Sequence, residues 1–303
     1  MLAATTVAFT ASDHYQLTGT LHSIATSAPP AACVVVNAGA GIPATYYSRF
    51  ASWLADGGVP VLTYDYRGIG SSRPASMRRF QASVEEWGSK DCAAAISMLA
   101  ATYPGVPIVL LGHSVGCFAT GFMQDPSRVA AMVFVAPHTG YYGDYASRQR
   151  PGMWLVWHAM MPLVTRAVGY FPGRRLGLPE DLPRGVALEW AARRRPDFRW
   201  NLRLPDGTPD VARHAALQQR FAAFRGSALS IRLSDDAFST AAGEARIERL
   251  FSGVRFEHVV IDPAACGTRT IGHFGFFRSR ARDALWPRVR DWITGRRWRE
   301  PPP

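Results

Sequence analysis

A serine stands between two glycines in the stretch 112–116, which reads Gly-His-Ser-Val-Gly. The apolar run Val109–Leu111 before it predicts a buried strand, and the residues after Gly116 can begin a helix. A strand, a sharp turn with serine at its apex and a helix are the setting in which a serine hydroxyl is exposed for nucleophilic attack. The two glycines fit this setting because so tight a turn leaves no room for larger side chains. The stretch therefore predicts that Ser114 is a nucleophile.

A nucleophilic serine needs a base to take its proton, and histidine suits this task because its pKa lies near neutrality. In such a sheet the partners follow the serine in the order acid, then histidine, after later strands. Of the eight histidines, His273 is the one that follows the last predicted strand in a loop of suitable length. We expect His273 to be the base, His258 to be structural within a strand, and His113 to pack beside the serine.

Two neighbouring carboxylates, Asp235 and Asp236, follow the predicted strand Ala228–Leu233. A carboxylate in that turn lies at the same sheet edge as Ser114, where it can hold the imidazole of the base in the correct tautomer. We favour Asp236 as the acid of the triad. Asp235 is the alternative, and both could instead cap the following helix.

The oxyanion of an acyl-transfer reaction needs N–H donors. One is expected to be the backbone N–H of Val115, directly after the nucleophile. The other is expected from the small-residue loop after the strand 32–36, at Gly39, or at Ala40 if the register shifts by one. Backbone donors explain why this loop carries no catalytic side chain. A third motif, Asp65-Tyr66-Arg67, is interpreted as a turn stabilised by an ion pair.

Strands and helices alternate along the chain on both sides of Ser114. This rhythm predicts an α/β fold with a mostly parallel central sheet flanked by helices, opened by an antiparallel ribbon near residues 7–22. The expected strands are 32–36, 59–64, 109–113, 128–135, 228–233 and 254–261, and the expected helices are 46–54, 84–101, 115–123, 242–251 and 280–293.

The alternation of strands and helices stops at residues 138–225, which are helical in composition and rich in aromatic residues. We predict a core in two pieces, 1–137 and 226–303, with an inserted helical cap over 138–225. Insertions above the carboxyl ends of parallel strands lie where ligands bind. Three aromatic residues of this cap could line an apolar acyl pocket or form the cap's own small core: Trp154, Trp157 and Tyr170.

Composition describes an ordinary globular protein of 303 residues, with 48% hydrophobic and 19% charged residues. The net charge of +11 comes almost wholly from scattered arginines, which favours a solvated surface and no nucleic-acid partner. The four cysteines are widely spaced, which argues against a disulfide framework or a zinc site. The apolar run 153–161 is too short to span a bilayer, so no stable membrane insertion is expected. We expect a cytoplasmic protein with free thiols.

These segments together resemble the α/β-hydrolase superfamily. The resemblance is carried by the loop 37–41, the turn 65–72, the stretch 112–116, and the Asp235-Asp236 and Gly272-His273-Phe274 segments. The ending Ile-Gly-His-Phe-Gly-Phe-Phe-Arg at 271–278 is similar to that of a bacterial subgroup of predicted hydrolases. The resemblance implies a Ser114–Asp236–His273 triad with no metal or organic cofactor.

The leading hypothesis is hydrolysis of a carboxylic ester or related acyl compound through an acyl-enzyme on Ser114. The substrate is expected to be a small, apolar molecule. Acyl transfer, or amidase or peptidase chemistry, would use the same triad. A non-catalytic ligand-binding homologue is a further alternative, and whether the protein forms a homo-oligomer is left open.

Overall fold

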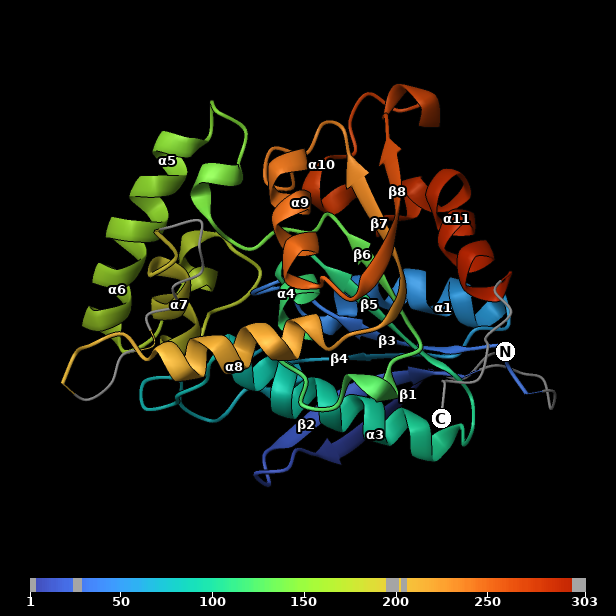
Figure 1. The fold of residues 1–303 in the computed structure, drawn as a ribbon, viewed down its shortest axis with the longest axis horizontal. Helices are drawn as coiled ribbons and strands as arrows, with labels where there is room; N and C mark the ends of the chain where they lie inside the picture. Colours follow the sequence, from blue (N-terminus) through green and yellow to red (C-terminus); the bar gives the residue numbers. More distant parts are fainter. Residues whose placement is uncertain (1–3, 24–28, 195–201, 203–205, 296–303) are drawn as a thin grey trace.

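The computed structural model describes residues 4–23, 29–194, 202 and 206–295, so the outer ends of the two predicted core pieces, 1–3 and 296–303, lie outside the described residues. Its centre is an eight-stranded sheet (Figure 1). The strands are β1 (Ala4–Thr10), β2 (Gln16–His22), β3 (Cys33–Asn37), β4 (Val61–Tyr64), β5 (Ile108–His113), β6 (Ala131–Val135), β7 (Gly226–Leu233) and β8 (Val254–Ile261).

The strand order across the sheet is β1-β2-β4-β3-β5-β6-β7-β8. The pairs β1–β2 and β2–β4 are antiparallel, and every other neighbouring pair is parallel. The predicted mostly parallel sheet with an antiparallel opening is therefore confirmed. Parallel strands put their carboxyl ends at one edge, so the loops after β3, β5, β6, β7 and β8 all meet there.

Helices cover both faces of the sheet (Figure 1). Helices α1 and α11 pack together on one face, where the rings of Trp53 and Trp286 lie 5.8 Å apart. On the other face the ring of Phe221 in α8 lies 5.4 Å from Phe118 in α4 and 5.2 Å from Phe251 after α9. The helices are α1 (Ser48–Asp56), α2 (Val84–Glu86), α3 (Ala93–Thr102), α4 (Val115–Thr120), α5 (Arg150–Leu155), α6 (Met161–Val168), α7 (Arg184–Ala191), α8 (Val211–Ala222), α9 (Ala241–Leu250), α10 (Gly272–Gly275) and α11 (Arg282–Thr294).

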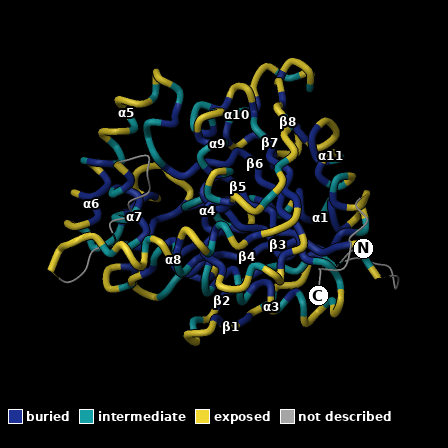
Figure 2. Tube along the Cα trace, in the orientation of Figure 1, coloured by how far each residue is buried: buried dark blue, intermediate teal, exposed yellow. Residues whose placement is uncertain are grey.

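The core follows the continuous apolar runs of the sequence. Every residue of β3, β4, β5 and β6 is buried, as expected of strands covered on both faces. The edge strand β1 is mostly exposed, and β8 has exposed and half-buried residues up to the buried Ile261 (Figure 2). The four cysteines are free thiols, three of them buried.

Between β6 and β7 the chain leaves the sheet and forms α5, α6 and α7, which gather at one end of the molecule (Figure 1). The helix α8 lies against the core instead, because its Phe221 packs against Phe118 of the core helix α4. Within the described part of the chain, no helix combines the length and the apolarity that crossing a membrane requires.

Candidate active site

Ser114 occupies a strained turn between β5 and α4. Its backbone has φ 58° and ψ −125°, a left-handed conformation that non-glycine residues rarely adopt. The glycines around it are required by close approach. A Cβ on Gly112 would lie 2.7 Å from the backbone of Cys117, and a Cβ on Gly116 would lie 2.2 Å from the Asn37 carbonyl oxygen. The turn pushes the Ser114 side chain out at the carboxyl edge of the sheet.

His273 and Asp236 reach Ser114 from two later strand ends. Nε2 of His273, in α10 after β8, lies 2.9 Å from Ser114 Oγ. Nδ1 of the same ring lies 2.7 Å from Oδ2 of Asp236, in the turn after β7. The three side chains thus form a continuous chain of hydrogen bonds in the order nucleophile, imidazole, carboxylate, which is the arrangement of a serine-hydrolase triad.

The Asp236 carboxylate is held as an anion. Burial raises its pKa, but the hydrogen bond and charge of His273 and the N–H groups of Phe238 and Ser239, which donate to Oδ1, leave the pKa below its ordinary value. An ionised Asp236 accepts the Nδ1–H of His273 and leaves the Nε2 lone pair facing Ser114. Nε2 can therefore take the hydroxyl proton.

Asp235 holds the loop and not the imidazole. Its carboxylate accepts the backbone N–H of Ile271 at 2.8 Å and of Gly272 at 3.0 Å. These bonds fix the start of α10 and so the position of His273. The contacts thus distinguish the two acidic candidates. Asp236 binds the imidazole ring of His273, and Asp235 binds the backbone beside it.

The loop after β3 lies against the serine. A Cβ on Gly39 would be 3.4 Å from Ser114 Cβ. The Gly39 N–H, however, donates to the buried hydroxyl of Tyr47 at 2.9 Å. The neighbouring Ala40 N–H makes no hydrogen bond within the described residues. Val115 opens α4, where a backbone N–H has no acceptor inside its own helix.

His113 links this loop to His273. Its Nε2 lies 3.0 Å from the backbone carbonyl of His273, and its Nδ1 lies 2.8 Å from Tyr47 Oη. A carbonyl only accepts, so Nε2 carries the proton and Nδ1 accepts from Tyr47. Burial, followed by the charge of His273, lowers the pKa of His113 to about 3, which keeps the ring neutral.

A second imidazole faces the serine, from a residue that sequence reasoning missed. Nε2 of His138 lies 2.9 Å from Ser114 Oγ, and the His138 and His273 rings are 5.3 Å apart. Residue 138 is the first residue of the predicted cap, for which the sequence predicts no catalytic role. Its position three residues after the end of β6, at the same edge as Ser114, is the signal that could have found it.

The three predicted cap residues have different surroundings. Trp157 packs on Trp190 at 5.3 Å, and the Trp190 ring lies 6.1 Å from His138. Trp154 is 43% exposed and touches His158, while Tyr170 lies under the guanidinium of Arg73. Of the three, Trp157 is the one whose ring contacts lead, through Trp190, to His138 beside the serine.

The interpretation of Asp65 and Arg67 as an ion pair is wrong. Asp65 accepts two backbone N–H groups in its own neighbourhood. Arg67 pairs instead with Asp13 at 2.6 Å and with the fully buried Asp91 at 2.7 Å. Both residues are structural, but the acidic partners of Arg67 come from other segments.

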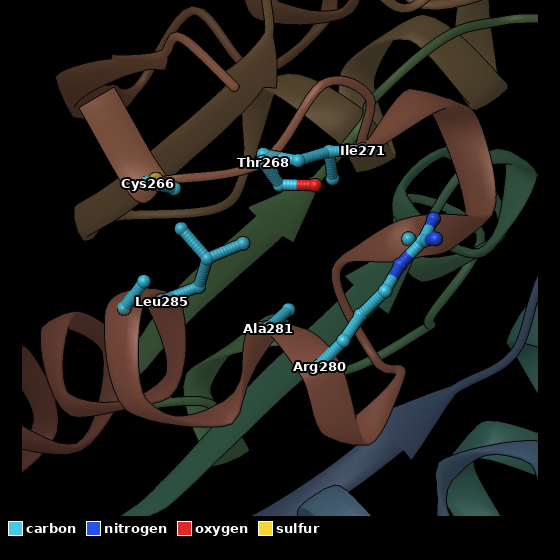
Figure 3. A pocket seen from close by; sticks show the side chains of 8 residues that line it. Cys266, Thr268, Ile271, Arg280, Ala281 and Leu285 are labelled. Carbon is cyan, nitrogen blue, oxygen red and sulfur yellow. The ribbon is translucent and has the colours of Figure 1, made fainter. Parts of the chain in front are cut away.

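Other polar clusters lie apart from Ser114. Glu244, Glu248 and His258 place ligand-type atoms within 4.8 Å of one another, but Glu244 already accepts from Ser230 and Arg232. A small cavity is lined by residues that all come from the segment 266–285 (Figure 3). It lies between α10 and α11, and neither α4 nor the inserted segment contributes to it.

A family model matches more than half of the chain. The family described as serine aminopeptidase, S33 matches residues 28–203. A monoglyceride lipase homolog of Monkeypox virus is 30% identical over 112 residues, which cover 36% of this chain. The matched region spans only 39% of that relative's own length.

Solved structures share the fold across almost the whole chain. An α/β-hydrolase from Penicillium sp. sh18 has a TM-score of 0.60 at 18% identity, covering 97% of this chain and 100% of its own. An esterase from Pyrococcus furiosus has a TM-score of 0.62 at 15% identity, covering 98% and 91%. The family match over more than half of the chain, together with the sheet topology, shows that the protein belongs to the serine aminopeptidase S33 family of α/β-hydrolase enzymes.

Proposed function

We propose that this enzyme hydrolyses a carboxylic ester, or a related acyl compound, of a small molecule through an acyl-enzyme on Ser114. The observation that carries the proposal is the hydrogen-bonded series Ser114–His273–Asp236, with distances of 2.9 Å and 2.7 Å. It supplies a nucleophile, a base and an acid that holds the base.

In the first half of the reaction, Ser114 Oγ bonds to the substrate carbonyl carbon while its proton passes to His273 Nε2. The imidazolium then gives that proton to the leaving oxygen as the ester bond breaks. In the second half, water loses a proton to His273 and attacks the acyl carbon. The bond to Oγ breaks, Oγ recovers the proton, and the acid product leaves.

We propose the backbone N–H groups of Val115 and Ala40 as the oxyanion donors. Ala40 is preferred to Gly39 because the Gly39 N–H already has an acceptor in Tyr47 Oη. Both proposed donors are backbone groups fixed by the fold, which stabilise developing charge without reorganisation.

The substrate is proposed to be apolar near the scissile bond. Phe238 and Phe274 pack against His273 at 5.3 Å and 4.9 Å, and Trp190 and Tyr145 pack against His138. An aromatic wall of this kind favours an acyl chain or aromatic group by burial of apolar surface. Peptide hydrolysis is the second candidate, because the matching family model is described as an aminopeptidase.

Access to the serine is proposed to need movement of the inserted segment. Ser114 is only 5% exposed and His273 only 8%. We propose that the cap expected at 138–225 provides this movement through its α5–α7 part, because α8 is packed on the core.

The proposal is tested with Ser114→Ala and a series of graded acyl esters, amides and thioesters. Turnover of a small activated ester should fall roughly a thousandfold or more. The exposed Ser127 provides the matched control, and Ser127→Ala should leave turnover unchanged. A fluorophosphonate probe should label the wild type at Ser114 only. Wild-type turnover in Ser114→Ala would refute the proposal. Product analysis with competing alcohols separates hydrolysis from acyl transfer.

A further inference from the structure

The serine oxygen has two imidazole neighbours, and the triad uses only one of them. His138 Nε2 and His273 Nε2 each lie 2.9 Å from Ser114 Oγ. His138 is 3% exposed. A hydroxyl has one proton to donate, so it can donate to only one of the two rings, and the other ring must donate to the oxygen.

The tautomer of His138 is set by its own loop. The backbone N–H of Gly140 donates to His138 Nδ1 at 2.9 Å, so Nδ1 carries a lone pair. A neutral imidazole with this arrangement has its proton on Nε2. The hydrogen bond at Ser114 therefore runs from His138 Nε2–H to Oγ, and the serine proton points to His273.

The surroundings keep His138 neutral. Burial is the main cause that lowers its pKa well below the ordinary value, and the charge of His273 acts in the same direction. Arg193 and His113 also lower this pKa, whereas Asp236 opposes them. A neutral donor beside Ser114 avoids repulsion with the imidazolium that forms on His273 during the reaction.

The loop that carries His138 is fixed on both sides of the ring. Ser239 Oγ donates to the carbonyl of Pro137 at 2.8 Å, and Arg193 donates to the carbonyl of Thr139. Ala136 has a φ of 51°, a strained left-handed conformation for alanine. Such strain persists only where the surrounding structure enforces it, and it is concentrated at functional sites.

We propose that His138 is a second catalytic histidine, a permanent N–H donor to Ser114 Oγ that stabilises negative charge on this oxygen. The proposal rests on the function proposed above. The Nε2 proton of His138 is not transferred. The bonds made and broken remain those between Oγ and the acyl carbon, and the moving proton remains the one exchanged with His273.

The donor should matter most in deacylation. In the acyl-enzyme, Oγ is an ester oxygen and a weak hydrogen-bond acceptor. As the bond to the acyl carbon breaks, the electron pair returns to Oγ, which becomes a strong acceptor before it regains its proton. An interaction that strengthens between ground state and transition state accelerates that step.

The test compares His138→Leu, which removes the donor, with His138→Gln, which keeps an N–H group on a neutral side chain. Pre-steady-state turnover of a p-nitrophenyl ester separates acylation from deacylation. We expect His138→Leu to slow deacylation on the order of tenfold to a hundredfold, with accumulation of acyl-enzyme as a larger burst. We expect His138→Gln to recover most of this loss. His158→Leu, which removes a buried histidine bonded to the Ala191 carbonyl, is the control and should remain within about twofold of wild type.

Wild-type deacylation in a folded His138→Leu variant would overturn the role of His138 while Ser114→Ala stays inactive, so the proposed function would survive. Equal losses in His138→Leu and His138→Gln would also overturn the role of His138 as a hydrogen-bond donor. Activity in Ser114→Ala would instead overturn the proposed function.

A second measurement does not depend on catalysis. In wild-type protein with ¹⁵N-labelled histidine, NMR should find His138 neutral and protonated at Nε2 between pH 6.5 and pH 9. A proton on Nδ1 in this range would overturn the proposal even if both variants failed to fold.

Discussion

The buried hydroxyl of Tyr47 lies 2.8 Å from Nδ1 of His113. The same hydroxyl accepts the Gly39 N–H, and His113 in turn donates to the backbone carbonyl of His273. These hydrogen bonds form one relay that joins the loop after β3 to the loop that carries His273. The residues that hold the site together are hydrogen-bonded to one another, as are the residues proposed to react.

Tyr47→Phe should break this relay. The change leaves the Gly39 N–H and His113 Nδ1 without a partner in a buried place, which costs about 1–3 kcal/mol of unfolding free energy. We expect a lower denaturation midpoint and a kcat reduced about tenfold through a less well held His273. Tyr103→Phe, at the end of α3, is the control. A rise in kcat/KM would show instead that Gly39 is the oxyanion donor and that Tyr47 restrains it.

Asp236→Asn and Asp235→Asn should differ sharply. The first removes the carboxylate that holds His273 in its reactive tautomer, and kcat should fall roughly a thousandfold to ten-thousandfold. The second leaves an oxygen that can still accept from Ile271 and Gly272, so kcat should stay within about tenfold of wild type. Steady-state kinetics on both purified variants decides the matter, and the reverse order would assign the acid to Asp235.

Gly116→Ala should destabilise the fold. Its Cβ would lie 2.2 Å from the Asn37 carbonyl oxygen, a contact that only backbone movement relieves. The expected loss is about 1–3 kcal/mol or more of unfolding free energy, measured by denaturant titration. Gly152→Ala is the matched control, since no atom lies within 4 Å of its Cβ and it stands in the exposed helix α5. That change should be neutral or stabilise by up to about 1 kcal/mol. Equal stability of the two variants would contradict the close packing described at Gly116.

The protein should lose stability in mild acid. Burial lowers the pKa of His22, His113 and His138. Below pH 6.5 the unfolded chain binds protons at these rings that the native state excludes, so the free energy of unfolding falls as pH falls from about 6.5 towards 4. Each ring contributes at most about 1.4 kcal/mol per pH unit, which is reached where the unfolded ring is protonated and the native ring is not.

His22 lies in β2, away from the serine, and tests this account separately from catalysis. His22→Gln should reduce the slope of unfolding free energy against pH by one such contribution, measured between pH 4 and pH 6.5. An unchanged slope would show that the buried ring does not exclude its proton. The lowered pKa of Asp236 adds a further loss only as pH falls below its ordinary value near 4.

Trp157 and Trp154 should differ in their effect on substrate binding. Trp157 packs on Trp190, which lies against His138, whereas Trp154 is 43% exposed. Trp157→Ala should raise KM for long-chain or aromatic esters about tenfold, and Trp154→Ala should leave it unchanged. A series of esters of increasing acyl length measures both. An effect of Trp154→Ala equal to that of Trp157→Ala would contradict the placement of the acyl group beside Trp157 and Trp190.

The sequence alone determined the elements that place the site. The alternation of strands and helices was sufficient to predict a mostly parallel sheet, and the apolar run before Gly112 was sufficient to predict the strand that leads to Ser114. These features are local, because hydrophobic periodicity and turn chemistry act over a few residues. Parallel strands then bring their carboxyl ends to one edge whatever the distant contacts are.

Only the tertiary structure decided which side chains meet at that edge. Spacing could not tell that Arg67 binds Asp91 and not Asp65, or that Tyr47 takes the Gly39 N–H. The end of β6 places the next loop at the edge of Ser114, but the hydrogen bond from His138 also depends on contacts of this loop with Ser239 and Arg193, which the sequence does not reveal. Such pairings depend on side-chain packing between segments far apart in the chain, and no local pattern encodes that packing.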